Sequence, residues 1–530
     1  MASSVGGALR ALTRPSEAHA LFGLAAVLLA VACLVPLLGI GTELLSEGAI
    51  ARLGSTLGQA RTWTLLMRSV SLALVVTACA LLFGVPMGVM LGRSDMPRRK
   101  AALLLHVFPV FLPPFLLALG WFHLLGRQGL AGSDWTAALL FGPVGVVLVL
   151  TFAFMPVVTA LTALGLQGID PSLEEAALVA SRPFRTVTQI LLPLAWRSIA
   201  LSGIVVFALA LSEIGVPMFL RVRTYPAAVF SRLGGIEYAP GEAVALVLPL
   251  LLIGLVLVAI DRRFVGSRTA FALGLRSREV APLRLGRARL AVSAAVWLLA
   301  FVSMLPLVAL LSRAGATGLS DAGGWIRSSL TTSLLSGAAA ASVIVLTGVI
   351  VGHALARMRW GAAALDTLAL LAFMTPASVL GVGLITVWNR PATQVVYSTV
   401  AIVVLGFVAR YAVLGVRTLA AVFARSSPHY EEAAACAGSR YTRRMFRIVV
   451  PMHARAIAAT WLLALVFCLR DLDTVVVFYP PGLEPLTVRI FTLEANGPEA
   501  VIAGLSIYHA AFTGFLLLAF GWMLRQRGGT

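Results

Sequence analysis

Residues 430–451 read YEEAAACAGSRYTRRMFRIVVP, a polar stretch in a chain that is otherwise strongly apolar. Two glutamates and four arginines share this stretch, whereas hydrophobic residues make up 59% of the 530-residue chain and charged residues only 12%. A soluble domain carries about 25% charged residues. We therefore expect a lipid bilayer to be the main solvent of this chain, and we expect the polar stretch to lie outside it.

Apolar windows recur along the whole chain, and each is long enough to cross the hydrocarbon core, which takes about 20 residues. In the first half they lie at roughly 20–40, 64–92, 101–125, 136–166, 197–220 and 242–260. In the second half they lie at roughly 290–312, 329–355, 362–388, 394–422, 458–480 and 500–524. The sequence therefore predicts an all-α, polytopic membrane protein with about twelve transmembrane helices.

The net charge of +19 comes from arginines in short loops between the apolar windows. This distribution is typical of cytosolic loops in membrane proteins and argues against a nucleic-acid-binding surface. It predicts that both termini are cytosolic. The predicted segments are a cytosolic N-terminus (1–19), a first transmembrane repeat (20–260), an arginine-rich cytosolic linker (261–289) and a second transmembrane repeat (290–530).

The two halves resemble each other in sequence. Residues 174–193, EEAALVASRPFRTVTQILLP, form a weaker copy of the polar stretch, and Pro193 aligns with Pro451. Farther along, Glu213 aligns with Asp471. Since each half has six predicted spans, an even number, both copies enter the membrane in the same orientation. This pattern predicts a parallel repeat about an axis along the membrane normal.

The second polar stretch is expected to form two short helical pieces. Paired acids, Glu431 and Glu432, precede small residues, and acids are favoured in the first turn of a helix. Gly438 then interrupts the helical pattern and permits a bend. Pro451 closes the second piece. A bent pair of helices with a small-residue elbow suits insertion into a groove on a partner.

This pattern resembles the EAA loop of bacterial ABC importer permeases, with Glu432, Ala433, Ala434, Gly438 and Pro451 at its motif positions. The first copy is degraded, because Ser181 replaces the glycine and the closing proline arrives one residue early. The residues of the first copy are Glu174, Glu175, Ala176, Ala177, Ser181 and Pro193. Two such loops in one chain resemble the fused permeases of ferric-iron and thiamine import systems, and residues 469–497 look most like the iron-type branch.

The resemblance implies the type I permease fold of ABC importers and a place in the bacterial cytoplasmic (inner) membrane. It implies that the two loops dock onto two copies of a cytosolic ABC ATPase subunit. It also implies a separate extracytoplasmic binding protein that delivers the substrate, while the permease itself performs no chemistry.

Lys100 is the only lysine, and no glycine-rich loop precedes it. A P-loop needs a lysine that reaches the phosphates. The chain is therefore expected to bind no ATP or other cofactor itself, and a partner would supply the ATP hydrolysis. The histidines and cysteines are scattered without metal-ligand spacing, so we predict no metal site.

Ionisable residues within spans are costly, about 2.5–3.5 kcal/mol each on insertion scales, and usually face a cavity or a partner. The clearest examples are Glu213, Arg470, Asp471 and Asp473. One interpretation places them along the translocation path or at its outer gate. The other places them near the outer interface, where Arg470 neutralises an acid on a neighbouring helix. Arg410 is interpreted as a structural partner rather than as a path residue.

Two questions stay open at this stage. The iron-type resemblance favours ferric iron or a small iron chelate, but thiamine, polyamine and phosphonate systems have similar permeases. A secondary transporter with two six-helix repeats, driven by protons or sodium, is the alternative from another class, with Glu213 and Asp471 as its coupling acids.

Overall fold

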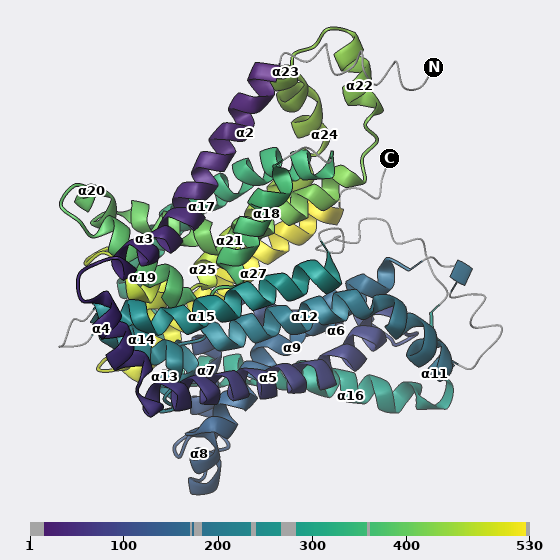
Figure 1. Ribbon diagram of the computed structural model, residues 1–530. Coiled ribbons are helices and arrows are strands. Elements are labelled where there is room, and N and C mark those ends of the chain that lie inside the picture. The colour runs from purple at the N-terminus through teal and green to yellow at the C-terminus, as the bar shows by residue number, and fades with distance from the viewer. Residues whose placement is uncertain are drawn as a thin grey trace.

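The computed structural model describes residues 15–169, 172–173, 183–234, 240–266, 282–357 and 361–525. In these ranges the chain is built of helices, and its only β-pairing is an isolated bridge between Ser94 and Leu283. Long helices run between two ends of the molecule (Figure 1). Helices α11 (Pro183–Thr186) and α22 (His429–Cys436) lie at one end, the α22 end, and α4 (Ala49–Leu57) and α20 (Gln394–Tyr397) lie at the other, the α20 end.

The other helices follow in chain order. In the first half they are α2 (Pro15–Leu29), α3 (Val35–Leu44), α5 (Ala60–Arg93), α6 (Arg99–Val107), α7 (Pro114–Leu125), α8 (Asp134–Leu140), α9 (Pro143–Gln167), α12 (Leu192–Ser212), α13 (Gly215–Phe219), α14 (Tyr225–Gly234) and α15 (Pro240–Ile260). In the second half they are α16 (Arg289–Val302), α17 (Leu305–Ala356), α18 (Ala362–Met374), α19 (Ala377–Trp388), α21 (Val400–Ala424), α23 (Tyr441–Arg444), α24 (Val450–Met452), α25 (Ala454–Arg470), α26 (Leu486–Glu494) and α27 (Glu499–Arg525).

Within the described ranges, eight helices are long and apolar enough to cross a membrane, and the number rises to eleven if each of three bent pairs is one span. The twelfth predicted window is missing from this count because α17 is counted once but contains parts of two predicted windows. The 52 residues of α17 would extend about 78 Å at 1.5 Å per residue, far more than a hydrocarbon core of about 30 Å, and the helix breaks at Gly315, where φ is 55°. The seventh and eighth predicted windows therefore both lie within α16 and α17. The all-α, multi-span prediction is confirmed.

Two predicted spans end earlier than the apolar windows suggested. The helix of window 197–220 ends at Ser212, and the helix of window 458–480 ends at Arg470. The next residues, Glu213 and Asp471, are extended (ψ 127° and 115°). The windows continued because apolar residues follow both acids, and composition alone does not reveal that the backbone leaves the helix there.

The third helix of each half is broken at the same place. The segments Arg99–Phe111 and Pro114–Leu125 meet at 106°, and the segments Ala362–Met374 and Ala377–Trp388 meet at 107°. Pro113 and Pro376 lie at the two breaks, where proline supplies no N–H and disfavours the helical conformation of the residue before it. The matched breaks agree with the sequence repeat.

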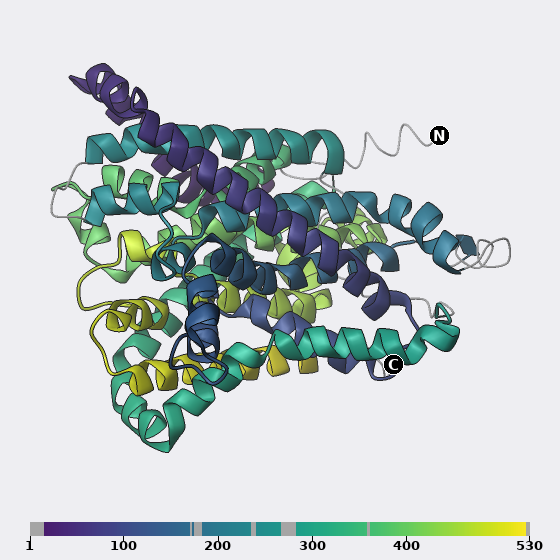
Figure 2. The same ribbon diagram turned by 90° about the horizontal axis from the view of Figure 1, so that it is seen from below.

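The first helix of each half packs against the opposite half. A side chain on Gly120 in α7 would collide with the backbone carbonyl of Pro306 in α17, and one on Gly383 in α19 would collide with that of Pro36 in α3. The turquoise α16, which leads the second half, likewise packs on α6 of the first half (Figures 1 and 2). The two sequence repeats are therefore interlocked in space and do not form two separate bundles.

Small residues let the second and fourth helices of each half approach closely. Gly84 and Gly88 of α5 face α9, where an added Cβ would lie 2.7 Å from Val158 and 2.6 Å from Thr162. In the second half, an added Cβ on Gly348 of α17 would lie 2.6 Å from the backbone of Gly415 in α21. Between membrane helices van der Waals packing is a main attractive force, so these contacts hold each half together.

Replacing Gly348 by valine should destabilise the protein, because the side chain would collide with the α21 backbone. Overpacking of this kind costs about 1–3 kcal/mol. Gly324→Val in the same helix is the matched control, since nothing lies within 4 Å of an added Cβ there. Thermal unfolding in detergent should show a lower midpoint for Gly348→Val than for the control. Equal midpoints would contradict the close packing of α17 on α21.

Candidate functional site

The second polar stretch forms the two helical pieces and the elbow expected from its sequence. Helix α22 ends at Cys436, and Gly438 follows with a φ of 78°, a left-handed value that favours glycine. Helix α23, a π-helical turn (η6, Met445–Val449) and α24 then lead into α25 through a bend of 79°. This stretch projects beyond the ends of the long helices (Figure 1).

Glu431 anchors α22 to the last turn of α17. Its carboxylate lies 2.8 Å from His353 Nε2 and accepts a hydrogen bond from Arg357 Nη2 at 2.6 Å. His353 is almost fully buried, and its Nδ1 lies 3.3 Å from the hydroxyl of Tyr441 in α23. Burial alone raises the pKa of the Glu431 carboxyl, but hydrogen bonds and charges from His353 and Arg357 outweigh it and lower the pKa to about 2.

Glu432, the acid at the motif position, points the other way. Its side chain is about half exposed, and its carboxylate lies 3.3 Å from Nδ1 of the exposed His429 in the same helix. Ala433 is also exposed, and Ala434 is partly buried. Two large apolar side chains, Tyr430 and Phe446, are 65% and 52% exposed in the same stretch. Glu431 therefore fixes α22 to α17, whereas Glu432 belongs to the exposed face of α22.

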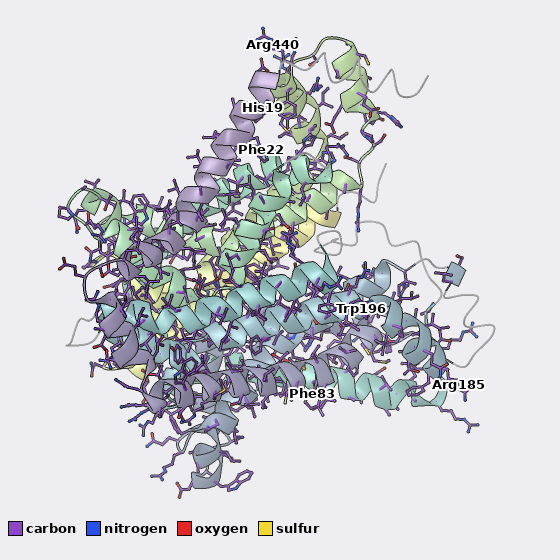
Figure 3. All side chains as sticks on the ribbon, in the orientation of Figure 1. His19, Phe22, Phe83, Arg185, Trp196 and Arg440 are labelled. Atoms are coloured by element: carbon purple, nitrogen blue, oxygen red, sulfur yellow. The ribbon has the colours of Figure 1, made fainter. Side chains whose placement is uncertain are left out.

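The N-terminal helix of the first half braces this stretch of the second half. Thr442 donates a hydrogen bond to Glu17 of α2 at 2.9 Å, and Arg440 lies 3.7 Å from the same carboxylate. Figure 3 shows α2 beginning beside the segment that bears Arg440. Sequence reasoning missed this contact, because Glu17 and Thr442 are 425 positions apart in the chain.

Most of the first polar stretch lies outside the described residues, namely Glu174, Glu175, Ala176, Ala177 and Ser181. Its closing part is described. A π-helical turn (η3, Val187–Leu191) precedes Pro193, as η6 precedes Pro451. Leu191 packs in one apolar cluster with Leu283, which lies just before α16. The closing part of the first polar stretch thus shares an apolar cluster with the segment before α16, and the second polar stretch bonds α2.

The predicted path acids hold the backbone where helices end. Glu213 accepts a hydrogen bond from the N–H of Val216 at 3.3 Å, and in the other half Asp471 accepts one from the N–H of Thr474 at 3.0 Å. Asp473 accepts the N–H of Ile214 at 2.9 Å, across the two halves. These acids therefore satisfy N–H groups at the start of the short helices that follow, α13 and η7 (Val475–Val477), where the first N–H groups have no intrahelical partner.

Two buried arginines donate hydrogen bonds to backbone carbonyls at the helix breaks. Arg470 donates to the carbonyl of Val110, beside the α6–α7 break of the opposite half. Arg410 donates to the carbonyls of Phe373 (2.8 Å) and Thr375 (2.6 Å) at the α18–α19 break, and to Ser212 Oγ at 3.2 Å. The structure thus brings the four predicted path residues and Arg410 to the breaks where the halves meet. Arg410 thus bonds backbone carbonyls at the break of the second half.

A buried ion-pair network was missed by sequence reasoning. Arg417 of α21 lies 3.1 Å from Asp261, at the end of the first half, and 2.9 Å from Asp366 of α18. All three side chains are 1% exposed or less, and Arg262 also bonds Asp366 at 2.6 Å. The network ties the last helix of the first half to the second half. The sequence feature that could have indicated the network is Arg417 itself, a second arginine in the same apolar window as Arg410.

Comparison with known proteins identifies the family. Residues 84–269 match the model of the binding-protein-dependent transport system inner membrane component. A probable molybdenum ABC transporter permease protein of Haloferax volcanii is 32% identical over 241 residues, which cover 44% of this chain and 88% of that protein. The chain belongs to this family of inner membrane transport components.

Two longer relatives align with most of the chain. A ferric transport system permease protein of Actinobacillus pleuropneumoniae is 22% identical over 457 residues, or 79% of this chain and 65% of that protein. A putative ferric transport system permease protein of Haemophilus influenzae is 24% identical over 409 residues, or 70% of this chain and 63% of that protein. The chain thus matches slightly less than two thirds of the length of these relatives. This family member is a multi-pass membrane protein.

Acid should loosen α22 through Glu431. Because the pKa of this carboxyl is lowered from 4.5 to about 2, its stabilising effect is present above pH 4.5 and is lost progressively as the pH falls toward 2. Hydrogen-exchange protection of residues 429–444 should therefore decrease between pH 6 and pH 3.

Glu431→Gln should show weak protection at both pH values, while Glu432→Gln should behave as the unchanged protein. Strong protection in Glu431→Gln at pH 6 would mean that the pair with His353 and Arg357 does not hold the helix.

Proposed function

We propose that this chain is the permease of an ATP-driven importer, which forms the substrate path and couples it to two copies of a cytosolic ATPase subunit. The observation that carries the proposal is the free face of α22, which bears Glu432 and Ala433 of the motif on an anchored helix beyond the bundle. Family membership supports it, since the family description itself names dependence on a binding protein. The proposal includes an extracytoplasmic binding protein, a cytosolic α22 end and cytosolic termini.

In this mechanism the ATPase subunits move the polar stretches, and the contacts described above pass the movement on. Glu431 links α22 to α17 through His353 and Arg357, and Glu17 links the same stretch to α2. Both α17 and α2 belong to the transmembrane bundle. A displacement of α22 would therefore shift helices that end near the α20 end, which is where the outer side of the path is expected.

The helix breaks supply the gate in this proposal. Asp473 and Arg470 of the second half bond the backbone of the first half at Ile214 and Val110. Unpaired backbone groups are expensive in a membrane, so these bonds favour the joined arrangement of the halves. We infer that Glu213, Arg470, Asp471 and Asp473 act on transport as gate residues that hold and release the seam between the halves.

Ferric iron, or a small iron chelate, is the proposed cargo. The relatives named as ferric transport permeases align with 70–79% of the chain and so include both halves. The Haloferax relative named for molybdenum is more similar in sequence, at 32% identity, but aligns with only 44% of the chain. The two-repeat architecture therefore favours iron over molybdate, and the names of these two relatives favour iron over the thiamine, polyamine and phosphonate alternatives.

Replacing Glu432 by alanine or Gly438 by valine should abolish ATPase binding without loss of membrane insertion. Glu432 lies on the free face, and valine is strained at the φ of 78° that Gly438 adopts. Gly482→Val is the matched control, because Gly482 has a φ of 79° and equally open surroundings in a loop outside this stretch. Purification from native membranes should recover a P-loop ATPase with the unchanged protein and with the control alone.

Recovery of the chain without any ATPase, together with uptake driven by an ion gradient in vesicles, would overturn the importer proposal. That result would favour a secondary transporter with Glu213 and Asp471 as its ion-coupling acids.

Cells that lack this chain should lose most high-affinity uptake of radioactive ferric iron and keep their uptake of molybdate. Loss of molybdate uptake alone would assign the cargo to the oxyanion class of the shorter relatives and would leave the permease role intact.

A further inference from the structure

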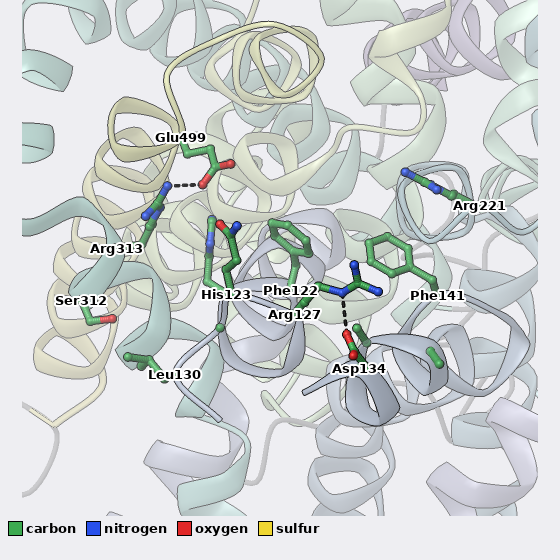
Figure 4. A pocket seen from close by; sticks show the side chains of 14 residues that line it. Phe122, His123, Arg127, Leu130, Asp134, Phe141, Arg221, Ser312, Arg313 and Glu499 are labelled. Carbon is green, nitrogen blue, oxygen red and sulfur yellow. Dashed lines mark hydrogen bonds and ion pairs between the residues drawn. The ribbon is translucent and has the colours of Figure 1, made fainter. Parts of the chain in front are cut away.

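A cavity of about 670 Å³ opens between the two halves (Figure 4), and no residue of either polar stretch lines it. The first half lines it with α7, α8 and the loop between them, and with Arg221 of the loop after α13. The second half contributes Ser312 and Arg313 from α17 and Glu499 from α27. A partner bound there would touch both halves at once.

The cavity has more positive than negative side chains. Arg127 pairs with Asp134 at 2.6 Å, and Arg313 pairs with Glu499. Arg221 is the unmatched cation, because none of the described carboxylates forms an ion pair with it. Its guanidinium lies 5.2 Å from the ring centre of Phe141, which stands between Arg221 and Arg127 in Figure 4.

The backbone fixes the position of Arg221. Its φ is 60°, and among the described residues only one other non-glycine residue, Arg98, has a positive φ. A tight turn holds it, in which the N–H groups of Arg221 and Val222 donate to the carbonyls of Met218 (3.1 Å) and Pro217 (2.8 Å). Backbone strain of this kind persists where the surroundings enforce it, often at binding sites.

The repeat provides an internal comparison. A related cavity of about 590 Å³ lies between α3 and α19 and is lined by Thr42, Glu43, Thr386 and Arg390. Arg127 and Arg390 are separated by the same 263 positions as Gly120 and Gly383. Arg313 and Glu43 are separated by the same 270 positions as the two prolines that those glycines contact, Pro306 and Pro36. The two cavities therefore occupy equivalent places.

The equivalent cavities differ in charge. Where the first has Arg313, the second has Glu43, which lies 3.9 Å from Arg390 and balances it. The second cavity has no counterpart of the unmatched Arg221 among its lining residues. A symmetric or uncharged partner would bind equally well in both orientations. An asymmetric partner with acids on one side would bind in one orientation only, with those acids at the first cavity.

We propose that the first cavity is a docking site for acidic side chains of the extracytoplasmic binding protein, with Arg221 as the main contact and the charge difference between the cavities fixing the orientation of that protein. This inference rests on the proposed function. Arginine suits the role because its planar guanidinium bonds a carboxylate in two places. The ion pairs of the cavity are solvent-exposed, which suits a transient protein contact better than tight capture of a small ion.

The test uses the full chain in lipid nanodiscs and, as probes, the purified extracytoplasmic binding proteins of the source organism, each added separately. One of them should bind, more weakly as salt rises. Arg221→Glu should slow its association about tenfold at low salt, as reversal of a steering charge does. Arg223→Glu is the matched control, because Arg223 is also exposed in the same loop but does not line the cavity.

Three outcomes would be decisive. Association slowed by Arg221→Glu, unchanged by Arg223→Glu and restored by a Glu→Lys change on the probe would establish the docking site. Equal slowing by both substitutions, or by neither, with normal binding to the unchanged chain, would overturn the docking site and leave the proposed function standing. Failure of every probe to bind the unchanged chain would overturn the proposed function and the docking site together. Unfolding midpoints of both variants check that the loop is intact.

Discussion

The structure depends on one constraint of the bilayer, namely that every backbone N–H and carbonyl group inside it needs a partner within the protein. Unbroken helices meet this need by themselves, but this chain ends or breaks helices inside its bundle at Leu112, Ser212, Thr375 and Arg470. The predicted path residues and Arg410 lie at these places, where carboxylates accept from free N–H groups and guanidinium groups donate to free carbonyls. The charge at these places follows from broken helices, whereas the Arg417 network joins helices through ion pairs.

The sequence was informative where a single helix decides the outcome. Apolar length predicted most of the spans. Gly438 and the paired acids predicted the shape of the α22 stretch. It was less informative where distant residues meet. Nothing local to Glu17, Asp261 or Arg417 indicates their partners, since such contacts arise from packing, and Glu431 and Glu432 could not be told apart until the turn of α22 relative to α17 was known.

The two ends of the molecule are related by the same packing arrangement. Because the first helix of each half lies on the other half, α2 reaches the α22 stretch at one end, and α3 borders a cavity between the halves at the other. A single helical segment, Glu17–Leu44, thus adjoins the proposed ATPase contact and one of the two cavities between the halves. Events at the two ends can influence each other through helix position, without a chain of small side-chain movements.

The exchange of first helices also has a consequence for how the protein is made. While the ribosome is still synthesising the first half, the surface around Gly120 lacks its cover, because that cover is Pro306 and its neighbours. The first half is therefore an unfinished structure in the membrane until the start of the second half has been inserted, and α2 must wait for α18 and α19 in the same way. Fusion of the halves in one chain keeps each unfinished surface next to the segment that completes it and away from other nascent chains.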